Sequence, residues 1–328
     1  MRTKIVYVLI SSEADIYLEQ AYISMYSLKY YMPDAFVVLL TDRATSETCV
    51  GARKEKLKYV DELIIIDLDS SRYNGQKRSR ILKTSVRNYV EGDILFIDTD
   101  TIVVSPFYDV DNIPYEIAAC WDTHSPAKTS PFYFLTLQDG GKLGWPIEDE
   151  DVYYNSGVIY MKDTHQTREF YSLWNKILQE GWEKGVTMDQ PSFAKTNYLM
   201  GHIVQSLGDE WNCELKYGLK YLRDAKIVHY LTTNRSANTC NQLFLLNELS
   251  IFEDMKNTDK IPDAVHACIV DPFSGLATVS QAFAGDDLFF LNSRLFSYCR
   301  TIFSSKFSKI IEFQIKVYLK IRRILCVR

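Results

Sequence analysis

Two aspartates one residue apart, Asp98 and Asp100, are the residues in this sequence whose types and spacing most suggest chemistry. They follow the apolar run 94–97 in the stretch DILFIDTDTIVV. Where a chain turns at the end of a strand, both carboxylates can face one ligand. Mg²⁺ and Mn²⁺ prefer oxygen ligands and take several of them from water and substrate phosphate. The pair therefore predicts a divalent cation that holds a diphosphate, and two solvated aspartates that cap a turn are the alternative.

Two other stretches carry polar side chains next to apolar runs. His229 lies within IVHYL, near the expected end of a strand, where its imidazole could complete the coordination of the cation. A histidine packed in the core is the alternative. Asn155, Ser156 and Gly157 precede the apolar run 158–161. Glycine allows a close approach of the backbone, and the amide and hydroxyl offer hydrogen bonds to a ligand. An ordinary turn explains the same three residues.

The elements that must position these residues are visible as short apolar runs rich in β-branched residues. The runs are 5–10, 36–40, 63–66, 94–97, 158–161 and 227–231. Runs without alternating polar residues are typical of strands covered on both faces, as in a mostly parallel sheet. Amphipathic helices are expected at 17–30 and at 80–90, with Ser79 as the N-cap of the second. This alternation predicts a doubly wound α/β sheet, whose ligands lie beyond the carboxyl ends of the strands.

The second half of the sequence is more varied. Residues 121–153 are rich in Pro, Gly and polar residues and indicate a long loop or excursion, and helices are expected at 166–180 and 189–199. The segment 306–328 has seven Lys or Arg residues, one Glu and an apolar stripe at helical spacing. Such a helix suits an anionic membrane surface, and packing on the domain or on a partner subunit is the alternative.

Composition limits the classes of protein that the chain could be. It has 328 residues, a net charge of −5, and hydrophobic and charged fractions of 47% and 24%, as in ordinary globular proteins. The net negative charge argues against general nucleic-acid binding. Seven scattered cysteines without a CxxC pair indicate reduced thiols. The first apolar run is too short for a signal peptide or a membrane span. We therefore expect a cytoplasmic protein, peripheral at the inner face of the membrane if the tail binds there.

Five stretches, in the same order, resemble the GT-A-fold glycosyltransferases and are most similar to glycosyltransferase family 8. They are 79–104, 154–162 (YNSGVIYMK), 188–193 (MDQPSF), 208–212 (GDEWN) and 227–231. The resemblance implies a Rossmann-like GT-A catalytic domain over 1–232, with a mostly parallel sheet flanked by helices. A C-terminal helical part over 233–305, on the acceptor side, and a basic amphipathic tail helix over 306–328 would follow. The resemblance also implies retaining, Mn²⁺-dependent transfer of a hexose from a UDP-sugar.

The resemblance assigns roles to individual residues. Asp98 and Asp100 match the DxD motif that holds Mn²⁺ against the UDP diphosphate, with His229 as the third protein ligand. Arg80 matches a basic residue that reaches toward the donor. Asp189 and Gln190 match residues of the sugar pocket that would steady the reacting carbon. The remaining residues expected to bind the donor are Val8, Ile10, Ser11, Ser12, Thr99, Asn155 and Ser156.

Three further residues are placed by the same comparison. Asp122 lies where the family often has an acidic residue facing the sugars. Trp211 and Asn212 match a structural turn and are therefore left out of the site. The sequence also departs from the family pattern, because the Gly and Lys-Pro-Trp that often follow the histidine are missing from HYLTTNRSANTC. Arg235 is the residue that could replace that lysine.

Several alternatives remain open from the sequence. In a retaining transfer a donor phosphate oxygen can accept the proton of the acceptor hydroxyl, whereas an inverting enzyme needs a base in 122–151, such as Glu148 or Asp151. A noncatalytic nucleotide-sugar-binding protein is a second alternative. FIDTDTI and the GDD at 285–287 partly fit a haloacid-dehalogenase phosphatase, although three strand–helix units precede the first motif. The acceptor is expected to be a glycan or glycolipid hydroxyl, in envelope polysaccharide or lipopolysaccharide synthesis.

Overall fold

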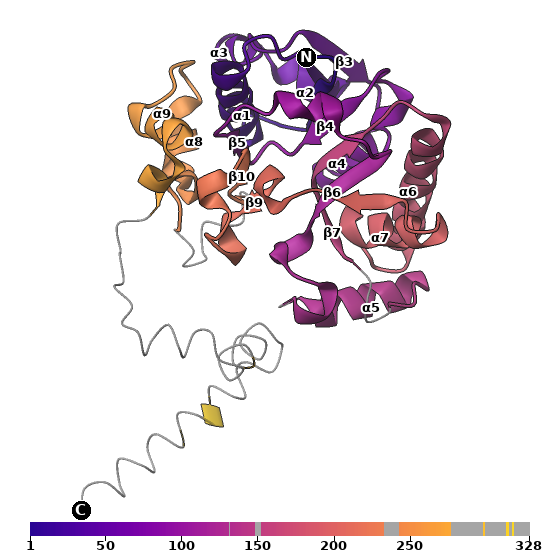
Figure 1. Ribbon diagram of the computed structural model, residues 1–328. Helices are drawn as coiled ribbons and strands as arrows, with labels where there is room; N and C mark the ends of the chain where they lie inside the picture. The colour runs from indigo at the N-terminus through magenta and orange to yellow at the C-terminus, as the bar shows by residue number, and fades with distance from the viewer. Residues whose placement is uncertain are drawn as a thin grey trace, which may run out of the picture.

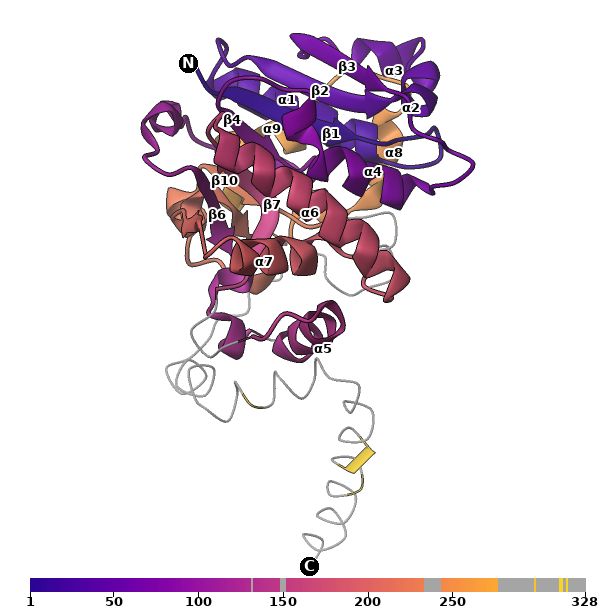
Figure 2. The same cartoon turned by 90° about the vertical axis from the view of Figure 1, so that its right-hand side faces the viewer.

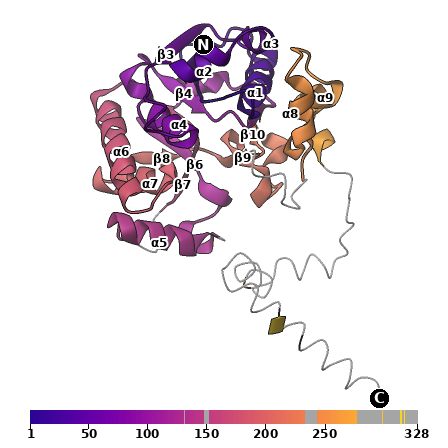
Figure 3. The ribbon, with the colours of Figure 1, turned by 180° about the vertical axis from the view of Figure 1, so that it is seen from behind.

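The computed structural model describes residues 1–130, 132–147, 152–232 and 243–276, together with the single positions 298, 313, 314 and 317. A seven-stranded sheet with helices on both faces forms the centre of the molecule (Figure 1). A three-stranded sheet lies beside it, and the helices of 243–276 pack against this second sheet and helix α1 (Figures 1 and 3). The predicted α/β class with a central, mostly parallel sheet is confirmed.

The main sheet has the strand order β3-β2-β1-β4-β7-β6-β8. Its strands are β1 (Lys4–Leu9), β2 (Val37–Asp42), β3 (Glu62–Ile66), β4 (Ile94–Ile97), β6 (Ile117–Trp121), β7 (Tyr154–Met161) and β8 (Val204–Ser206). All neighbours are parallel except at β7, which runs antiparallel to both β4 and β6. The carboxyl ends of β1 and β4 therefore lie at the same edge of the sheet, next to the amino end of β7.

The second sheet has the order β5-β10-β9, from β5 (Thr101–Val103), β10 (Ile227–His229) and β9 (Cys213–Glu214). Residues 98–100 are thus the link by which the chain leaves β4 in the main sheet and enters β5 in the second. His229 pairs with Thr101 on one side and with Glu214 on the other. The expectation that 227–231 belongs to the same sheet as the other apolar runs is wrong, and this second sheet brings the histidine to the aspartates.

The helices are α1 (Tyr17–Tyr31), α2 (Arg43–Thr48), α3 (Ala52–Glu55), α4 (Gly75–Thr84), α5 (Tyr133–Leu143), α6 (His165–Glu183), α7 (Asp189–Leu199), α8 (Leu249–Met255) and α9 (Asp263–Val270). The helices expected at 17–30, 166–180 and 189–199 are confirmed. The helix expected at 80–90 is wrong in both bounds. Asn74, not Ser79, is its N-cap and accepts from the Lys77 amide at 2.9 Å. Its C-terminal end tightens into a 3₁₀ turn, where the Ser85 hydroxyl donates to the Ile81 carbonyl.

Three other expectations need correction. Asn155, Ser156 and Gly157 lie inside β7 rather than before it, because the strand begins at Tyr154. The run 63–66 is not covered on both faces, since β3 is an edge strand in which Leu63 and Ile65 are exposed. Residues 121–153 are not one long loop, because they contain α5 and short 3₁₀ turns.

Apolar side chains fill both faces of the main sheet. Helix α1 packs on one face and helices α4, α6 and α7 on the other (Figure 2). Trp174 and Phe193, on α6 and α7, are fully buried with their ring centroids 4.9 Å apart. Burial of such side chains contributes roughly 1.5–3 kcal/mol each, which stabilises the packing of α6 and α7 against the sheet.

Several predictions fall on residues outside the described ranges. They concern Arg235, Glu148, Asp151, the GDD at 285–287, most of 233–305 and the membrane contact of 306–328. Within the described part of the chain, no helix combines the length and the apolar character that crossing a membrane requires.

Candidate active site

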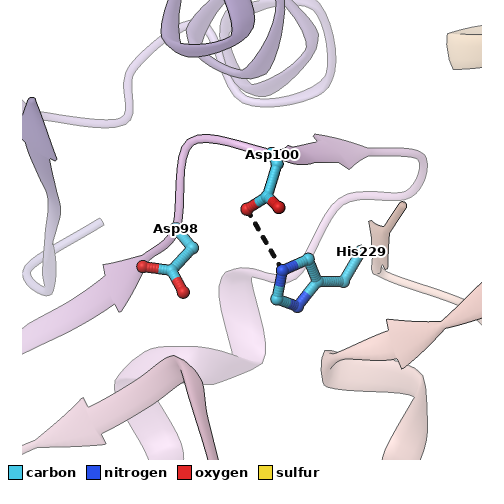
Figure 4. Close-up of side chains that lie close together, drawn as sticks. All are labelled: Asp98, Asp100 and His229. Atoms are coloured by element: carbon cyan, nitrogen blue, oxygen red, sulfur yellow. Dashed lines mark hydrogen bonds and ion pairs between the residues drawn. The ribbon is translucent and has the colours of Figure 1, made fainter. Parts of the chain in front are cut away.

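Asp98, Asp100 and His229 converge at the edge between the two sheets, as Figure 4 shows. One possible ligand atom from each lies within 4.8 Å of the others, and the His229 Nε2 is 3.2 Å from the Asp100 Oδ1. Two carboxylates and one imidazole are a donor set for Mn²⁺ or Mg²⁺ that leaves positions for phosphate and water. The residues present therefore fit a divalent cation.

The electrostatics of this cluster also fit a cation. Burial, with a smaller contribution from the neighbouring Asp100 charge, raises the pKa of Asp98 to about 6, although Lys83 acts in the opposite direction. Burial by itself would lower the pKa of His229, but the Asp100 carboxylate raises it above its ordinary value. Two carboxylates held together in a recess thus favour the approach of positive charge.

A cavity of about 630 Å³ opens beside the cluster, within the range of small-molecule sites. The loop after β1 lines one wall, α4 lines another, and residues 98–100 lie at its end. Eight of the residues that the sequence predicted to bind the donor line this cavity: Val8, Ile10, Ser11, Ser12, Arg80, Asp98, Thr99 and Asp100. The structure therefore places the residues expected to bind the nucleoside and the aspartates expected to bind the metal around one cavity.

Lys83 is a residue of this cavity that the sequence analysis missed. Its Nζ lies 3.1 Å from the Asp98 Oδ2, 3.1 Å from the Asp189 Oδ2 and 3.3 Å from the Ser156 hydroxyl. Arg80, one helical turn earlier, places its Nε 3.5 Å from the Asp189 Oδ1. Burial would raise the pKa of Asp189, but Lys83 and Arg80 lower it to about 2. Two basic residues of α4 therefore connect the predicted metal ligand to the predicted sugar pocket.

Lys83→Met is expected to destabilise the metal-free protein, because it leaves Asp98 and Asp189 without their shared counter-charge. Removing one partner of a buried ion pair lowers the free energy of unfolding by about 3 kcal/mol. Urea denaturation at neutral pH measures the difference. Lys176→Met on α6 is the control, since Lys176 is exposed and should change the stability by less than about 0.5 kcal/mol. Equal stability of Lys83→Met and the wild type would contradict the bridging role.

The residues predicted for the sugar pocket lie together on the other side of Lys83. The Ser156 hydroxyl donates to the Asp189 Oδ2 at 2.8 Å, and the Gln190 Nε2 donates to the Asp122 Oδ1 at 2.9 Å. The Asn155 Nδ2 donates to the same Asp122 oxygen at 3.1 Å. Burial raises the pKa of Asp122 above its ordinary value, although the hydrogen bonds from these two amides act in the opposite direction. Asp122 thus lies between Asn155 and Gln190, and its expected place facing the sugars stays a prediction.

Asn212 and Glu214 also belong to the site. The expectation that Trp211 and Asn212 form only a structural turn holds for Trp211, which packs in the core against Phe107. It is wrong for Asn212, whose side chain contacts His229 and Asn155. Glu214 is fully buried, accepts from the Thr123 amide at 2.7 Å and contacts the Asn155 Nδ2. No sequence signal marked Glu214, because its role depends on a pairing of β9 with β10.

No family model and no curated protein sequence matches the chain. Solved structures do resemble it. One is the galactosyltransferase LgtC in complex with donor and acceptor sugar analogs. Its TM-score is 0.51 at 13% sequence identity, and the match covers 81% of this chain and 99% of that chain. The glycosyltransferase GlyE from Streptococcus pneumoniae TIGR4 has a TM-score of 0.51 at 17% identity, over 86% and 67% of the two chains. The bifunctional glycosyltransferase WbbM gives 0.51 at 17% identity, over 73% and 47%.

The fold is that of the GT-A glycosyltransferases. This confirms the fold class that the five sequence stretches implied, and the low identities limit the conclusion to the fold. The phosphatase alternative is not retained, because its first aspartate would follow the opening strand of the domain, whereas Asp98 follows the fourth strand along the chain. For a protein with this fold, a functional proposal must explain the paired aspartates and the cavity beside β1.

Proposed function

We propose that the chain is a glycosyltransferase that moves a hexose from a UDP-sugar to a hydroxyl of a glycan or glycolipid, with Mn²⁺ or Mg²⁺ as cofactor, and that it is most similar to glycosyltransferase family 8. The observation that carries the proposal is the cluster of Asp98, Asp100 and His229 at the end of a 630 Å³ cavity. Three basic residues of α4 also line that cavity, namely Arg78, Arg80 and Lys83. A cation site and a basic wall together suit a nucleoside diphosphate ester.

Each group of residues would have a different role, which its position in the site determines. Residues 8–12, at the end of β1 and in the loop after it, would hold the nucleoside in the cavity that they line. A cation bound by the cluster would offset the negative charge that develops on the departing diphosphate. Lys83 and Arg80 would add fixed positive charge next to the same phosphates. Asp189 and Gln190 would orient the hexose next to the diphosphate.

The stereochemistry that we propose is retention. A donor phosphate oxygen then accepts the acceptor proton, so no carboxylate base is required. Asp122 is the candidate base for the inverting alternative within the described residues, since burial raises the pKa of its carboxyl. The anomeric proton coupling of the new glycosidic linkage, measured by NMR on the product, distinguishes the two outcomes.

The donor is best tested by a thermal-shift panel of UDP-, GDP-, CMP- and dTDP-sugars, each with and without Mn²⁺. We expect a UDP-sugar with Mn²⁺ to raise Tm the most, because a ligand at about 100 times its Kd adds roughly 2.7 kcal/mol to stability. Excess chelator is the control and should remove the shift. A larger shift with another nucleotide, or a shift independent of metal, would contradict the proposal. Binding of a UDP-sugar without transfer to any acceptor would favour the noncatalytic alternative.

The acceptor and the cellular setting are further proposals. A glycolipid or lipid-linked glycan, as in envelope polysaccharide or lipopolysaccharide synthesis, suits a protein whose segment 306–328 is basic and amphipathic in sequence. Contact of that segment with an anionic membrane surface, and a cytoplasmic location, stay predictions. The division into a catalytic part, an acceptor-side part over 233–305 and the tail also stays a prediction.

A further inference from the structure

A line of hydrogen-bonded side chains joins the sugar-pocket residues to the cation cluster. The His229 Nδ1 lies 3.0 Å from the Asn212 Oδ1, and the Asn212 Nδ2 lies 3.0 Å from the Asn155 Oδ1. Asn155 in turn contacts Asp122 and Glu214 through its Nδ2. His229, Asn212 and Asn155 are all buried. Because buried polar groups need partners, the direction of each hydrogen bond in this line is constrained by its neighbours.

The backbone amide of Gly157 sets that direction. It lies 2.8 Å from one side-chain atom of Asn155, and a backbone N–H can only donate. That atom of Asn155 is therefore the oxygen. The same oxygen faces the side-chain amide of Asn212, so the Asn212 atom there must be the NH₂ group. The other atom of Asn212, an oxygen, then faces the His229 ring and can only accept.

The opposite end of the line agrees with this direction. The Asn155 NH₂ faces the Asp122 Oδ1 and an oxygen of Glu214, and both carboxylates accept. The second Glu214 oxygen accepts from the Thr123 amide, so Glu214 is held by donors on both sides. The acceptors at Asp122 and Glu214 and the donor at Gly157 thus fix Asn155 from two independent directions.

We propose that Asn212 is a positioning residue that holds the His229 ring with its proton on Nδ1 and presents the Nε2 lone pair to the cation. The Nε2 faces Asp100 at 3.2 Å, on the side of the proposed metal. Ligating histidines usually donate their other N–H to such a partner, which orients the ring and makes it a better ligand. The part that concerns the cation rests on the proposed function, whereas the assignment of the Nδ1 proton does not.

The same side chain couples two functions. The Asn212 oxygen orients the metal ligand, and its NH₂ group holds Asn155 in the sugar pocket. The two functions can be separated by substitution. Asn212→Leu has a similar shape and loses both hydrogen bonds. Asn212→Asp still accepts from the Nδ1 proton but turns a second acceptor toward the Asn155 oxygen.

The first test is the affinity for Mn²⁺ alone, measured by electron paramagnetic resonance. We expect Asn212→Leu to bind about 10- to 100-fold more weakly than the wild type, as for other residues that orient a ligating histidine. Asn212→Asp should stay within about 3-fold of the wild type in Mn²⁺ affinity, since it keeps the acceptor. Its KM for the UDP-sugar should rise, because Asn155 loses its donor. Unchanged Mn²⁺ affinity in Asn212→Leu overturns the inference, even if the wild type transfers sugar.

The second test reads the proton directly in the metal-free protein and does not depend on turnover. The Asp100→Leu background is used, because the Asp100 carboxylate lies 3.2 Å from the Nε2 and would otherwise compete for the ring proton. Long-range ¹H–¹⁵N correlation spectra at alkaline pH, where the ring is neutral, should then show the His229 proton on Nδ1, and the added Asn212→Leu substitution should remove this preference. His165, an exposed residue of α6, serves as the unchanged reference. In the Asp100→Leu background, a proton on Nε2, or the same tautomer after the added Asn212→Leu substitution, overturns the inference. The predicted tautomers support it even if no acceptor is found.

Discussion

Asp100→Asn is expected to abolish Mn²⁺-dependent binding of UDP and to reduce sugar transfer by a factor of about 100 or more. A cation that stabilises the charge of a departing diphosphate contributes several kcal/mol, and each 1.4 kcal/mol is about tenfold in rate. Asp98→Asn should have the same effect, since both carboxylates face His229. Titration calorimetry of UDP with and without Mn²⁺, together with initial rates, measures the change.

The control for these variants is Asp254→Asn, because Asp254 is an exposed aspartate on α8. It should leave both the UDP affinity and the rate unchanged. Circular dichroism should show that the site variants stay folded, because neither substitution changes side-chain volume. If the variants kept the Mn²⁺ dependence of the wild type, the proposed cation site would be wrong.

Gly157→Ala is expected to have the second large effect, because the space beside Gly157 is filled by His229, the proposed metal ligand. A Cβ added there would lie 2.6 Å from the His229 Cε1 and 2.9 Å from the Asn155 Oδ1. The ring of His229 and the amide of Asn155 must therefore move. Overpacking of this kind costs about 1–3 kcal/mol, and a displaced ligand should weaken Mn²⁺ binding roughly tenfold or more.

Gly141→Ala provides the matched control for that variant. Gly141 lies in α5, and a Cβ there would meet no atom within 4 Å. Alanine inside a helix stabilises by about 0.5–1 kcal/mol relative to glycine, so this variant should be slightly more stable than the wild type and equally active. Thermal unfolding and Mn²⁺ titration of both variants test the prediction. Wild-type Mn²⁺ affinity in Gly157→Ala would show that the ring has room to adjust.

The local parts of the site could be predicted from the sequence. Four apolar residues followed by Asp98 and Asp100 indicate a strand end with acidic ligands, and His229 carries a similar signal within its own apolar run. Residues 8–12 likewise span the end of the first apolar run and the polar residues after it. These features can be recognised from residues that are neighbours in the sequence. They depend on the pattern of apolar residues in a strand and on the rule that ligands lie at the carboxyl ends of strands.

Lys83 was missed because the helix boundary was misplaced. A helix that begins after Ser79 puts Arg80 in the first turn and gives Lys83 no special position. The observed α4 begins at Gly75, so Arg80 and Lys83 lie one full turn apart within the helix and both line the cavity. The Asn74-Gly75 pair was the signal for the true start, since asparagine is a strong N-cap.

The line from Gly157 to His229 could not be derived from the sequence. Its members come from β7, from the residue before β9, and from β10, which are far apart along the chain. Asn212 is left out of the predicted site because, by resemblance to the family, it matches a structural turn. Its role depends on the pairing of strands β5, β9 and β10, which have only two or three residues each and are too short for a periodic signal.

The central claim is that Asp98, Asp100 and His229 bind a divalent cation against the diphosphate of a nucleotide sugar. A crystal grown with UDP and Mn²⁺, with data collected at the manganese absorption edge, tests it most directly. The account predicts one anomalous peak within bonding distance of all three side chains and of the UDP phosphates, and the uridine beside residues 8–12. An ordered UDP in that cavity without manganese, or manganese bound elsewhere with the three side chains free, would contradict it.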